Sequence, residues 1–379
     1  MVRRGRVFTY AALLSVLTVV GAACSDDDDS SADREGEAGE EAATGGEGGD
    51  GGGGLLAEVQ ERGTLNCGVN ETVPGFGLVD EQGEFSGFDI EFCKAVAAAV
   101  LGDAEAVEYT PLSDPETRFP ALQSGEIDVL IRNTTYTASR DGGEGARFLA
   151  TTFFDGQGMM VRADSGFQSI EDMNGTTICV LAGTTTELNL ATRFAAAGLT
   201  YEPLTFPDAD ALGEAFAAGQ CDGWTSDLSQ LAGQRSAFPE GPDALVIFDD
   251  AFSKEPLGPA VRDGDDEWAS AVNWAVIATI QAEEFGITSE NVEQMTTSDN
   301  PDVLRFLGEP VAAEEGAEPE PFDPGLGLEP DFAVDVISQV GNYGEIYDRT
   351  VGPGTPLGLE RGINAQWSDG GLLYAPPYR

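Results

Sequence analysis

Histidine is missing from the sequence, and basic residues are scarce. The 379-residue chain has no His, and only 19 Lys and Arg stand against 67 Asp and Glu. Without His there is no Ser-His or Cys-His nucleophile and no His-ligated metal site. The net charge of −48 repels nucleic acid and anionic membrane surfaces, so we expect neither as a binding partner.

The acidity belongs mostly to the part of the chain that is expected to fold. Residues 1–24 carry three Arg, and residues 25–54 carry a net charge of −10, so residues 55–379 carry −41. Such a Lys-poor, acidic surface is suited to high salt, where it keeps a protein hydrated. An acid-rich proteome would give the same composition, and the sequence does not separate the two explanations.

Long apolar runs are absent except at the N-terminus. Arg3, Arg4 and Arg6 precede an apolar run over residues 7–20, and Gly21, Ala22 and Ala23 lead to Cys24. This is the pattern of a secretory signal, too short for a membrane span. A cysteine directly after small residues resembles the site where bacterial lipoproteins are cleaved and acylated. We therefore predict a lipoprotein signal peptide over residues 1–24 with lipidation at Cys24, although Gly21 stands where Leu is usual and simple cleavage is the alternative.

Residues 25–54 also lack apolar residues in any run. They consist of acidic residues, Gly, Ser and Ala, a composition that cannot bury enough surface to order itself. We interpret them as a disordered acidic and Gly-rich tether. The run of Asp26 to Asp29 lacks the ligand spacing of a calcium loop, and the sequence predicts no metal site and no cofactor.

Cysteine is rare, with five residues in all. If Cys24 carries lipid, four remain, and in an exported protein these predict two disulfides with three alternative pairings. Cys67 and Cys93 fall in the first of two lobes predicted below, and Cys179 and Cys221 fall in the second. We therefore expect pairing within lobes, as Cys67–Cys93 and Cys179–Cys221.

Residues from 55 onward alternate short β-branched runs with helical periodicity, which indicates α/β architecture. Strands are expected over residues 64–69, 106–109 and 127–131, with a helix capped by Asp89 and ended by Gly102 and a second helix over residues 117–124. A second series repeats this plan: strands over 177–181, 202–206 and 222–226, and helices over 185–197 and 209–218.

Two extended segments, 156–162 and 256–262, connect the two series and predict a hinge. The sequence thus predicts a first lobe from residues 55–157 plus 262–379 and a second lobe from residues 158–261. Beyond Asn300 we expect a Pro- and Glu-rich loop over 312–330, a helix over 331–340, and a tail that packs on the first lobe.

Three polar patches follow apolar strands, where open α/β sheets bind ligands. In residues 132–140, Arg140 has the planar fork that binds a carboxylate, although it would equally suit the surface. Residues 182–187 place glycine and threonines at a helix start, which suits an anion or a simple N-cap. In residues 222–227, Asp227 suits an ammonium group or the cap of the next helix.

The order of these motifs resembles the general L-amino-acid-binding proteins of polar amino acid ABC transporters. The resemblance covers nearly all of residues 55–379 and rests on residues 65–70, 87–90, 132–140, 183–188, 219–227, 254–262, 341–345 and 374–377. It implies the type II periplasmic-binding-protein fold, with two α/β lobes and two hinge-crossing segments. The loop over residues 312–330 is longer, and the chain more acidic, than the family pattern.

The resemblance also implies roles for single residues. Arg140 and Thr135 fall where relatives hold the ligand α-carboxylate, Thr185 falls where the second lobe adds to that grip, and Asp227 falls on the acid that pairs with the α-ammonium. Asn70 stands where relatives selective for basic amino acids carry an acid, which argues against such a specialist. Further candidates are Phe76, which either packs on the ligand side chain or belongs to the core, and Arg132 and Asn133, whose roles are open.

The expected function is binding. We expect a monomeric, extracytoplasmic protein that captures free L-amino acids and passes them to the permease of an ABC importer, and that touches the membrane only through its lipid anchor. The negative field is expected to slow the capture of glutamate and aspartate. Two alternatives are the ligand-binding module of a sensor and a small-molecule lyase on the same fold. The first would need an apolar span after Arg262, and the second a base beside a nucleophile; the sequence offers neither.

Overall fold

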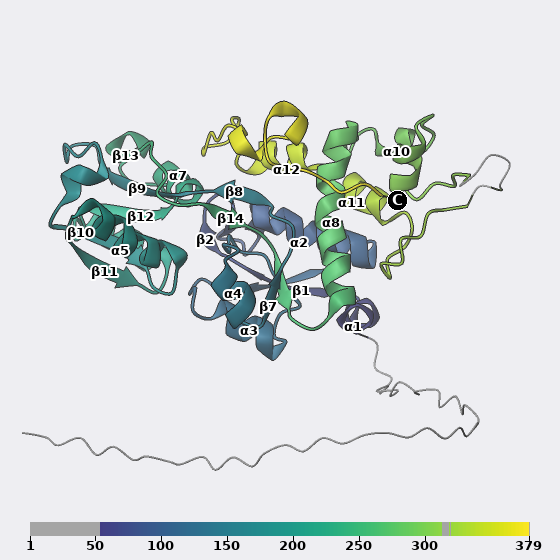
Figure 1. The fold of residues 1–379 in the computed structure, drawn as a ribbon, viewed down its shortest axis with the longest axis horizontal. Helices are drawn as coiled ribbons and strands as arrows, with labels where there is room; N and C mark the ends of the chain where they lie inside the picture. Colours follow the sequence, from purple (N-terminus) through teal and green to yellow (C-terminus); the bar gives the residue numbers. More distant parts are fainter. Residues whose placement is uncertain (1–53, 313–317, 319, 379) are drawn as a thin grey trace, which may run out of the picture. The chain divides into compact units, whose positions relative to one another are not determined.

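The computed structural model describes residues 54–312, 318 and 320–378. Cys24, the signal peptide and nearly all of the tether lie outside the described residues, as does part of the 312–330 loop. The described chain is built on two five-stranded sheets, and we call each sheet with its covering helices a lobe (Figure 1). This is the mixed α/β, two-lobed architecture that the sequence predicts.

The sheet of the first lobe has the order β5-β1-β6-β15-β7. The first three strands are parallel, and β15 and β7 run antiparallel to their neighbours. Its strands are β1 (Leu65–Val69), β5 (Val107–Pro111), β6 (Val129–Leu130), β7 (Ala146–Phe148) and β15 (Ala260–Arg262).

The sheet of the second lobe repeats this plan with the order β11-β10-β12-β9-β13. Again three parallel strands are followed by two strands, β9 and β13, that each pair antiparallel with their neighbours. Its strands are β9 (Gln157–Arg162), β10 (Thr176–Leu181), β11 (Tyr201–Phe206), β12 (Gly223–Asp227) and β13 (Leu245–Ile247). Because the parallel strands of each sheet end on one side, loops after β6, β10 and β12 can meet at one place.

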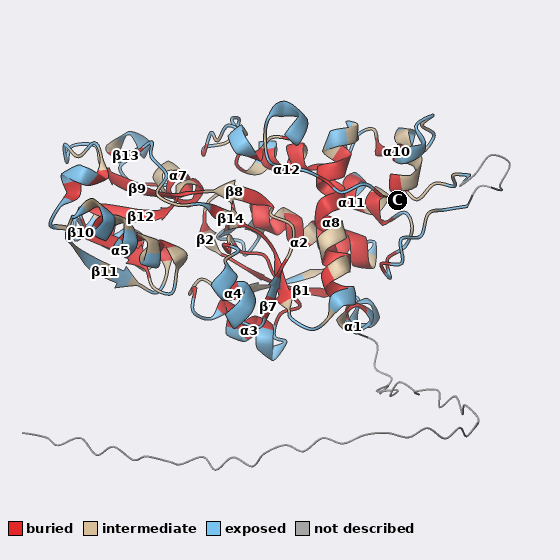
Figure 2. Ribbon diagram, viewed as in Figure 1, coloured by how far each residue is buried: buried red, intermediate tan, exposed pale blue. Residues whose placement is uncertain are grey.

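Helices cover both sheets. In the first lobe the long helix α8 packs on α2 and α11, and Figure 2 shows α8 and α2 largely buried. Their apolar residues recur on more than one face, since these helices lie between a sheet and other helices. The first-lobe helices are α1 (Leu55–Arg62), α2 (Phe88–Leu101), α3 (Arg118–Ser124), α4 (Ala138–Gly143), α8 (Asp266–Phe285), α9 (Val292–Met295), α10 (Pro301–Phe306), α11 (Phe332–Gln339) and α12 (Tyr343–Thr350). Those of the second lobe are α5 (Thr185–Ala197), α6 (Ala209–Ala217) and α7 (Leu228–Ser236).

The crossing between the lobes differs in place from the prediction. Strands β8 (Phe153–Asp155) and β14 (Glu255–Leu257) form a separate two-stranded antiparallel sheet, which runs between the two large sheets in Figure 1. Residues 157–162 already belong to the second sheet, and residues 260–262 to the first. The chain changes sheet at Gly156. The backbone of the neighbouring segment comes close here, since an added Cβ would lie 3.0 Å from the Ser253 carbonyl oxygen. The exact lobe boundaries given above remain predictions.

One helix cap also differs. Helix α2 begins at Phe88 with Gly87 as its N-cap, so Asp89 is inside the helix and is not the cap. The Gly87 backbone has a φ of 130° and packs against the Phe76 carbonyl, which glycine alone tolerates well. The Asp89 side chain is therefore free for another partner, described below.

The tail packs on the first lobe, as expected. Tyr343 of α12 donates a hydrogen bond to the Thr152 carbonyl at 2.8 Å, and the Tyr347 ring stacks on Phe153. Near the C-terminus the Tyr378 ring lies 4.8 Å from that of Trp274 on α8. These aromatic contacts extend the first-lobe core.

The structure contains the disulfides Cys67–Cys93 and Cys179–Cys221, one in each lobe, as expected. The first ties β1 to α2, and the second ties β10 to the segment just before β12. Both are buried, with Cys67, Cys93 and Cys179 fully so.

Removing a disulfide is expected to destabilise the protein, because each closes a substantial loop. The linked residues are 26 and 42 positions apart, so chain entropy predicts a loss of roughly 3–4 kcal/mol for each Cys→Ala pair. Denaturant unfolding of Cys179→Ala/Cys221→Ala, with and without reductant, measures it. Reductant should destabilise the wild type more than this variant, and equal unfolding midpoints for both proteins in oxidising buffer would contradict the expectation.

Candidate functional site

A small polar cavity of about 30 Å³ lies where loops of both lobes meet. Its walls come from α3 and the segment after β6 in the first lobe, and from the ends of β10 and β12 in the second. The lining residues are Pro115, Arg118, Arg132, Asn133, Thr135, Arg140, Leu181, Thr184, Thr185, Thr186, Ser226, Asp227 and Gln230.

Six of the residues proposed from the sequence meet at this cavity: Arg132, Asn133, Thr135, Arg140, Thr185 and Asp227. Arg140 is not a surface arginine. It lies in α4, is 8% exposed, and donates from Nη1 to the Thr135 carbonyl oxygen at 2.9 Å. The Thr135 and Thr185 hydroxyl oxygens are 3.4 Å apart and belong to different lobes. The lobes thus contact each other at the cavity.

Asn70 and Phe76 do not line the cavity. Asn70 stands behind it, donating from Nδ2 to the Asn133 side-chain oxygen at 3.2 Å. Phe76 is 1% exposed, with its ring 5.2 Å from that of Phe153 and 5.7 Å from that of Phe88. The structure therefore places Phe76 in the aromatic core of the first lobe, which was the second of its two possible roles.

Asn133 has an unusual backbone conformation. Its φ of 32° is the one positive value among non-glycine residues of the described chain. The Asp89 carboxylate holds it there by accepting a hydrogen bond from the Asn133 backbone N–H at 2.7 Å. Burial raises the pKa of Asp89 to about 7, against the lowering effect of this bond and of Arg132. Strained backbone held by a buried acid is typical of a functional loop.

Arg118 is a cavity residue that the sequence reasoning missed. It begins helix α3 and is 3% exposed. Its guanidinium lies 5.2 Å from the centre of the Phe119 ring, within the range of cation–π contacts. Burial, together with the nearby charges of Arg140 and Arg132, lowers its pKa. An arginine in the first turn of a helix is usually exposed, so only the folded structure identifies it.

Asp227 is the acid at the opposite side of the cavity. It occupies the N-cap position of α7, yet its side chain makes no capping hydrogen bond. It is 5% exposed, and its Oδ1 is buried without a partner among the described residues. Burial raises its pKa well above the usual value, and the charges of Asp155 and Glu255 add to this effect. Since capping does not explain the position of this carboxylate, it is available to a cationic group.

Asp155 and Glu255, also missed, lie directly opposite each other on β8 and β14. Glu255 accepts hydrogen bonds from the Thr185 hydroxyl at 2.9 Å and from Asn189 at 2.8 Å. Burial raises the pKa of Asp155 to about 6. The Thr185 hydroxyl hydrogen is thus directed at Glu255, which leaves its oxygen as an acceptor and its backbone N–H, in the first turn of α5, as a donor.

The described residues contain no cluster of three or more Cys, Asp or Glu side chains placed to hold a metal ion. None of their helices is both long and apolar enough to cross a membrane. The cavity instead has a cationic wall, formed by three arginines, and an acidic wall around Asp227.

Two open sheets of the same strand plan, joined by paired crossing strands beside a shared cavity, define the type II periplasmic-binding-protein fold. The chain belongs to the bacterial extracellular solute-binding proteins, family 3, whose family model matches residues 65–290.

Similar proteins include binding components of transport systems. The general L-amino acid-binding periplasmic protein AapJ of Rhizobium johnstonii is 49% identical, over 86% of this chain and 92% of its own. The glutamate/glutamine/aspartate/asparagine-binding protein BztA of Rhodobacter capsulatus is 48% identical, over 86% and 93%. A solved periplasmic binding protein from Brucella ovis with glutathione bound has a TM-score of 0.81 and 46% identity, over 86% of this chain and 99% of its own.

The buried acids predict a pH-dependent effect of Asp227→Asn on stability in the ligand-free protein. The pKa of Asp227 is raised on folding, so ionising it costs the folded state stability as the pH rises above the unfolded value of 3.8. The variant has no such cost. Its melting temperature relative to wild type should therefore increase between pH 4 and pH 8, as scanning calorimetry can measure; a difference independent of pH would contradict this.

Proposed function

We propose that this protein captures free L-amino acids outside the cytoplasm and delivers them to the permease of an ABC importer. The observation that carries the proposal is the opposed charge of the cavity walls. An amino acid has a carboxylate and an ammonium group on one carbon, and the cavity offers guanidiniums from one lobe and a carboxylate from the other. The names of the similar proteins and the family membership support the same function.

In the proposed complex, Arg140 binds the α-carboxylate through its planar fork, with backbone N–H groups at the start of α5 as further donors. Asp227 pairs with the α-ammonium. The Thr185 hydroxyl, which donates to Glu255, can accept from that ammonium. This role differs from the carboxylate contact expected from the sequence, since one hydroxyl hydrogen cannot serve both acids.

Closure of the lobes is part of the proposal. Hydrogen bonds already link them: Gln234 of α7 donates to the Thr72 carbonyl at 2.9 Å, and Asn133 donates to Gln230 at 3.4 Å. Rotation at β8 and β14 would open these contacts and admit the ligand. The importer would then recognise the closed form.

Export through the signal at residues 1–24, a lipid anchor at Cys24 and a monomeric state complete the proposal. These features rest on sequence pattern alone. Ligand turnover is not proposed: mass spectrometry after incubation should return the amino acid unchanged, and any conversion product would favour the lyase alternative.

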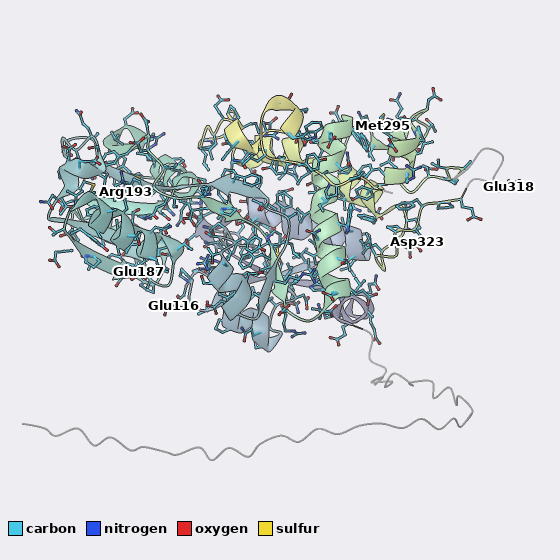
Figure 3. The ribbon with its side chains drawn as sticks, viewed as in Figure 1. Glu116, Glu187, Arg193, Met295, Glu318 and Asp323 are labelled. Atoms are coloured by element: carbon cyan, nitrogen blue, oxygen red, sulfur yellow. A yellow bond between two sulfur atoms is a disulfide. The ribbon has the colours of Figure 1, made fainter. Side chains whose placement is uncertain are left out.

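Loss of either charged partner is expected to weaken amino-acid binding strongly. Truncating one member of a buried charge pair costs about 2–5 kcal/mol, or at least about 30-fold in affinity. A thermal-shift screen of the common L-amino acids selects the ligand, and calorimetry then compares wild type, Arg140→Ala and Asp227→Ala. Arg193→Gln is the control, because Arg193 lies in α5 with its side chain 39% exposed and has only a 3.7 Å ion pair with Glu171 (Figure 3).

Two results would contradict the proposal. One is a wild type that none of the amino acids stabilises. The other is unchanged affinity in both cavity variants while each retains a cooperative melting transition.

A methyl group at Gly233 is expected to impair closure. In α7, a Cβ at this position would lie 2.5 Å from the Pro74 carbonyl oxygen of the other lobe. Gly233→Ala should therefore weaken ligand binding without lowering the melting temperature of the free protein. Gly213→Ala in α6 is the matched control, because its Cβ would make only ordinary contacts at 3.7 Å with Trp224. Equal affinities of the two variants by calorimetry would show that closure does not need this approach.

A further inference from the structure

A second cavity, of about 250 Å³, lies in the first lobe between the end of α8, the start of α10 and the C-terminal tail. The end of the yellow tail lies beside α8 and α10 in Figure 1, and the Tyr378 ring contacts Trp274 of α8 and Phe306 of α10. No residue lines both this cavity and the one between the lobes. The two are therefore separate sites on the described chain.

Four aromatic side chains line this second cavity: Phe285, Trp367, Tyr374 and Tyr378. Trp367 is 50% exposed and Tyr374 is 66% exposed, with their ring centres 5.6 Å apart. Exposed aromatic side chains that gather at one place are typical of a binding surface. The face of an aromatic ring attracts cations, yet none of the cation–π contacts within the described chain involves these four rings.

The charges around the cavity favour a cation. Helix α8 is 20 residues long and has no basic residue in its last turn, where the helix dipole is negative. In that turn Glu283 pairs with Arg361 at 2.8 Å, but Glu284, which lines the cavity, forms no ion pair within the described chain. Asp302 of α10 adds a second carboxylate to the lining, and Arg305 pairs with it at 2.9 Å. The described chain thus leaves part of this negative charge without a partner.

The buried side chain of Gln281 also points to a ligand. It is 4% exposed, lines the cavity, and lies three positions before Glu284 on the same face of α8. Its amide makes no side-chain hydrogen bond with the described residues. Because a buried amide without hydrogen bonds is unfavourable, a partner for it is expected in the cavity.

We propose that this cavity binds a small primary amine in its ammonium form. An ammonium group has three N–H donors, and the side-chain oxygens of Gln281, Glu284 and Asp302 can accept them. The carbon chain of the amine would lie against the rings of Trp367 and Tyr374. A free amino acid is not the expected occupant, since the two acids would repel its carboxylate. The inference does not depend on the function proposed for the other cavity.

The test uses n-butylammonium chloride as the probe and n-butanol as a neutral molecule of nearly the same shape. The Trp367 indole N–H reports binding in nitrogen–proton NMR spectra, and its signal is identified among the four Trp by its loss in Trp367→Phe. The amine should shift this signal saturably, with an affinity at least about tenfold above that of the alcohol, because only the ammonium is charged. Tetramethylammonium, which is charged but has no N–H donor, should bind at least about threefold more weakly than n-butylammonium.

Two variants separate a local contact from the net charge of the chain. Glu284→Gln should weaken n-butylammonium binding at least about threefold, because it removes a charged acceptor. Glu290→Gln removes an equal charge from an exposed residue that does not line the cavity, and it should keep the wild-type affinity. Arg379 follows Tyr378 and lies outside the described residues, so Arg379→Gln is titrated as well, to remove the last cation of the chain itself.

The comparison of amine and alcohol decides the inference in the wild-type protein, without any variant having to fold. Equal affinities for the two probes would overturn it. So would a Trp367 signal that the amine shifts neither in the wild type nor in Arg379→Gln. An equal loss of affinity in Glu284→Gln and Glu290→Gln would also overturn it, since net charge alone would then explain binding. None of these results changes the proposed amino-acid function, whose residues line the other cavity.

Discussion

The central physical constraint in this structure is the burial of opposite charges in one small cavity. Guanidiniums from α3 and from the segment after β6 form one wall, and Asp227, with Asp155 and Glu255 behind it, forms the other. Each group is costly to bury alone, and several lack partners within the described chain. A zwitterion that joins the two walls would satisfy both at once, which explains why a strongly acidic chain retains buried arginines here.

The ends of the parallel strands and the two hinge strands place these charges at the cavity. The parallel strands β6, β10 and β12 end beside the cavity, so polar segments distant in sequence meet there. The hinge strands contribute as well, because β8 and β14 bring Asp155 and Glu255 opposite each other beneath the start of α5. Thr185 therefore links the hinge to the ligand site through its hydrogen bond to Glu255. Lobe closure and ligand charge would in this way act on the same few residues.

Sequence reasoning predicted the parallel strands of both sheets, helices such as α2, α3, α5, α6 and α11, and six cavity residues, because strand ends and helix starts are local patterns. It did not predict the edge strands β7 and β13 or short helices such as α4. Arg140 and Asp227 follow apolar strands, which is a signal in the sequence itself. Arg118 and Glu255 gave no such signal, since their importance comes from burial among residues far away in the chain. The roles of Asp89 and Phe76 were harder still to predict from the sequence. Asp89 is a residue type that often caps helices, but Gly87 occupies the N-cap position of α2. The Phe76 ring packs in an aromatic core whose other members come from α2, β8 and α12.

The most direct test of the account measures whether both charged ends of an amino acid are recognised. The N-acetyl derivative of L-glutamine lacks the ammonium, and its α-amide lacks the α-carboxylate. Calorimetric titration compares the affinity of each derivative with that of L-glutamine. The account predicts that each modification weakens binding at least about 30-fold relative to the parent amino acid. Binding of either derivative with the affinity of the parent would contradict it.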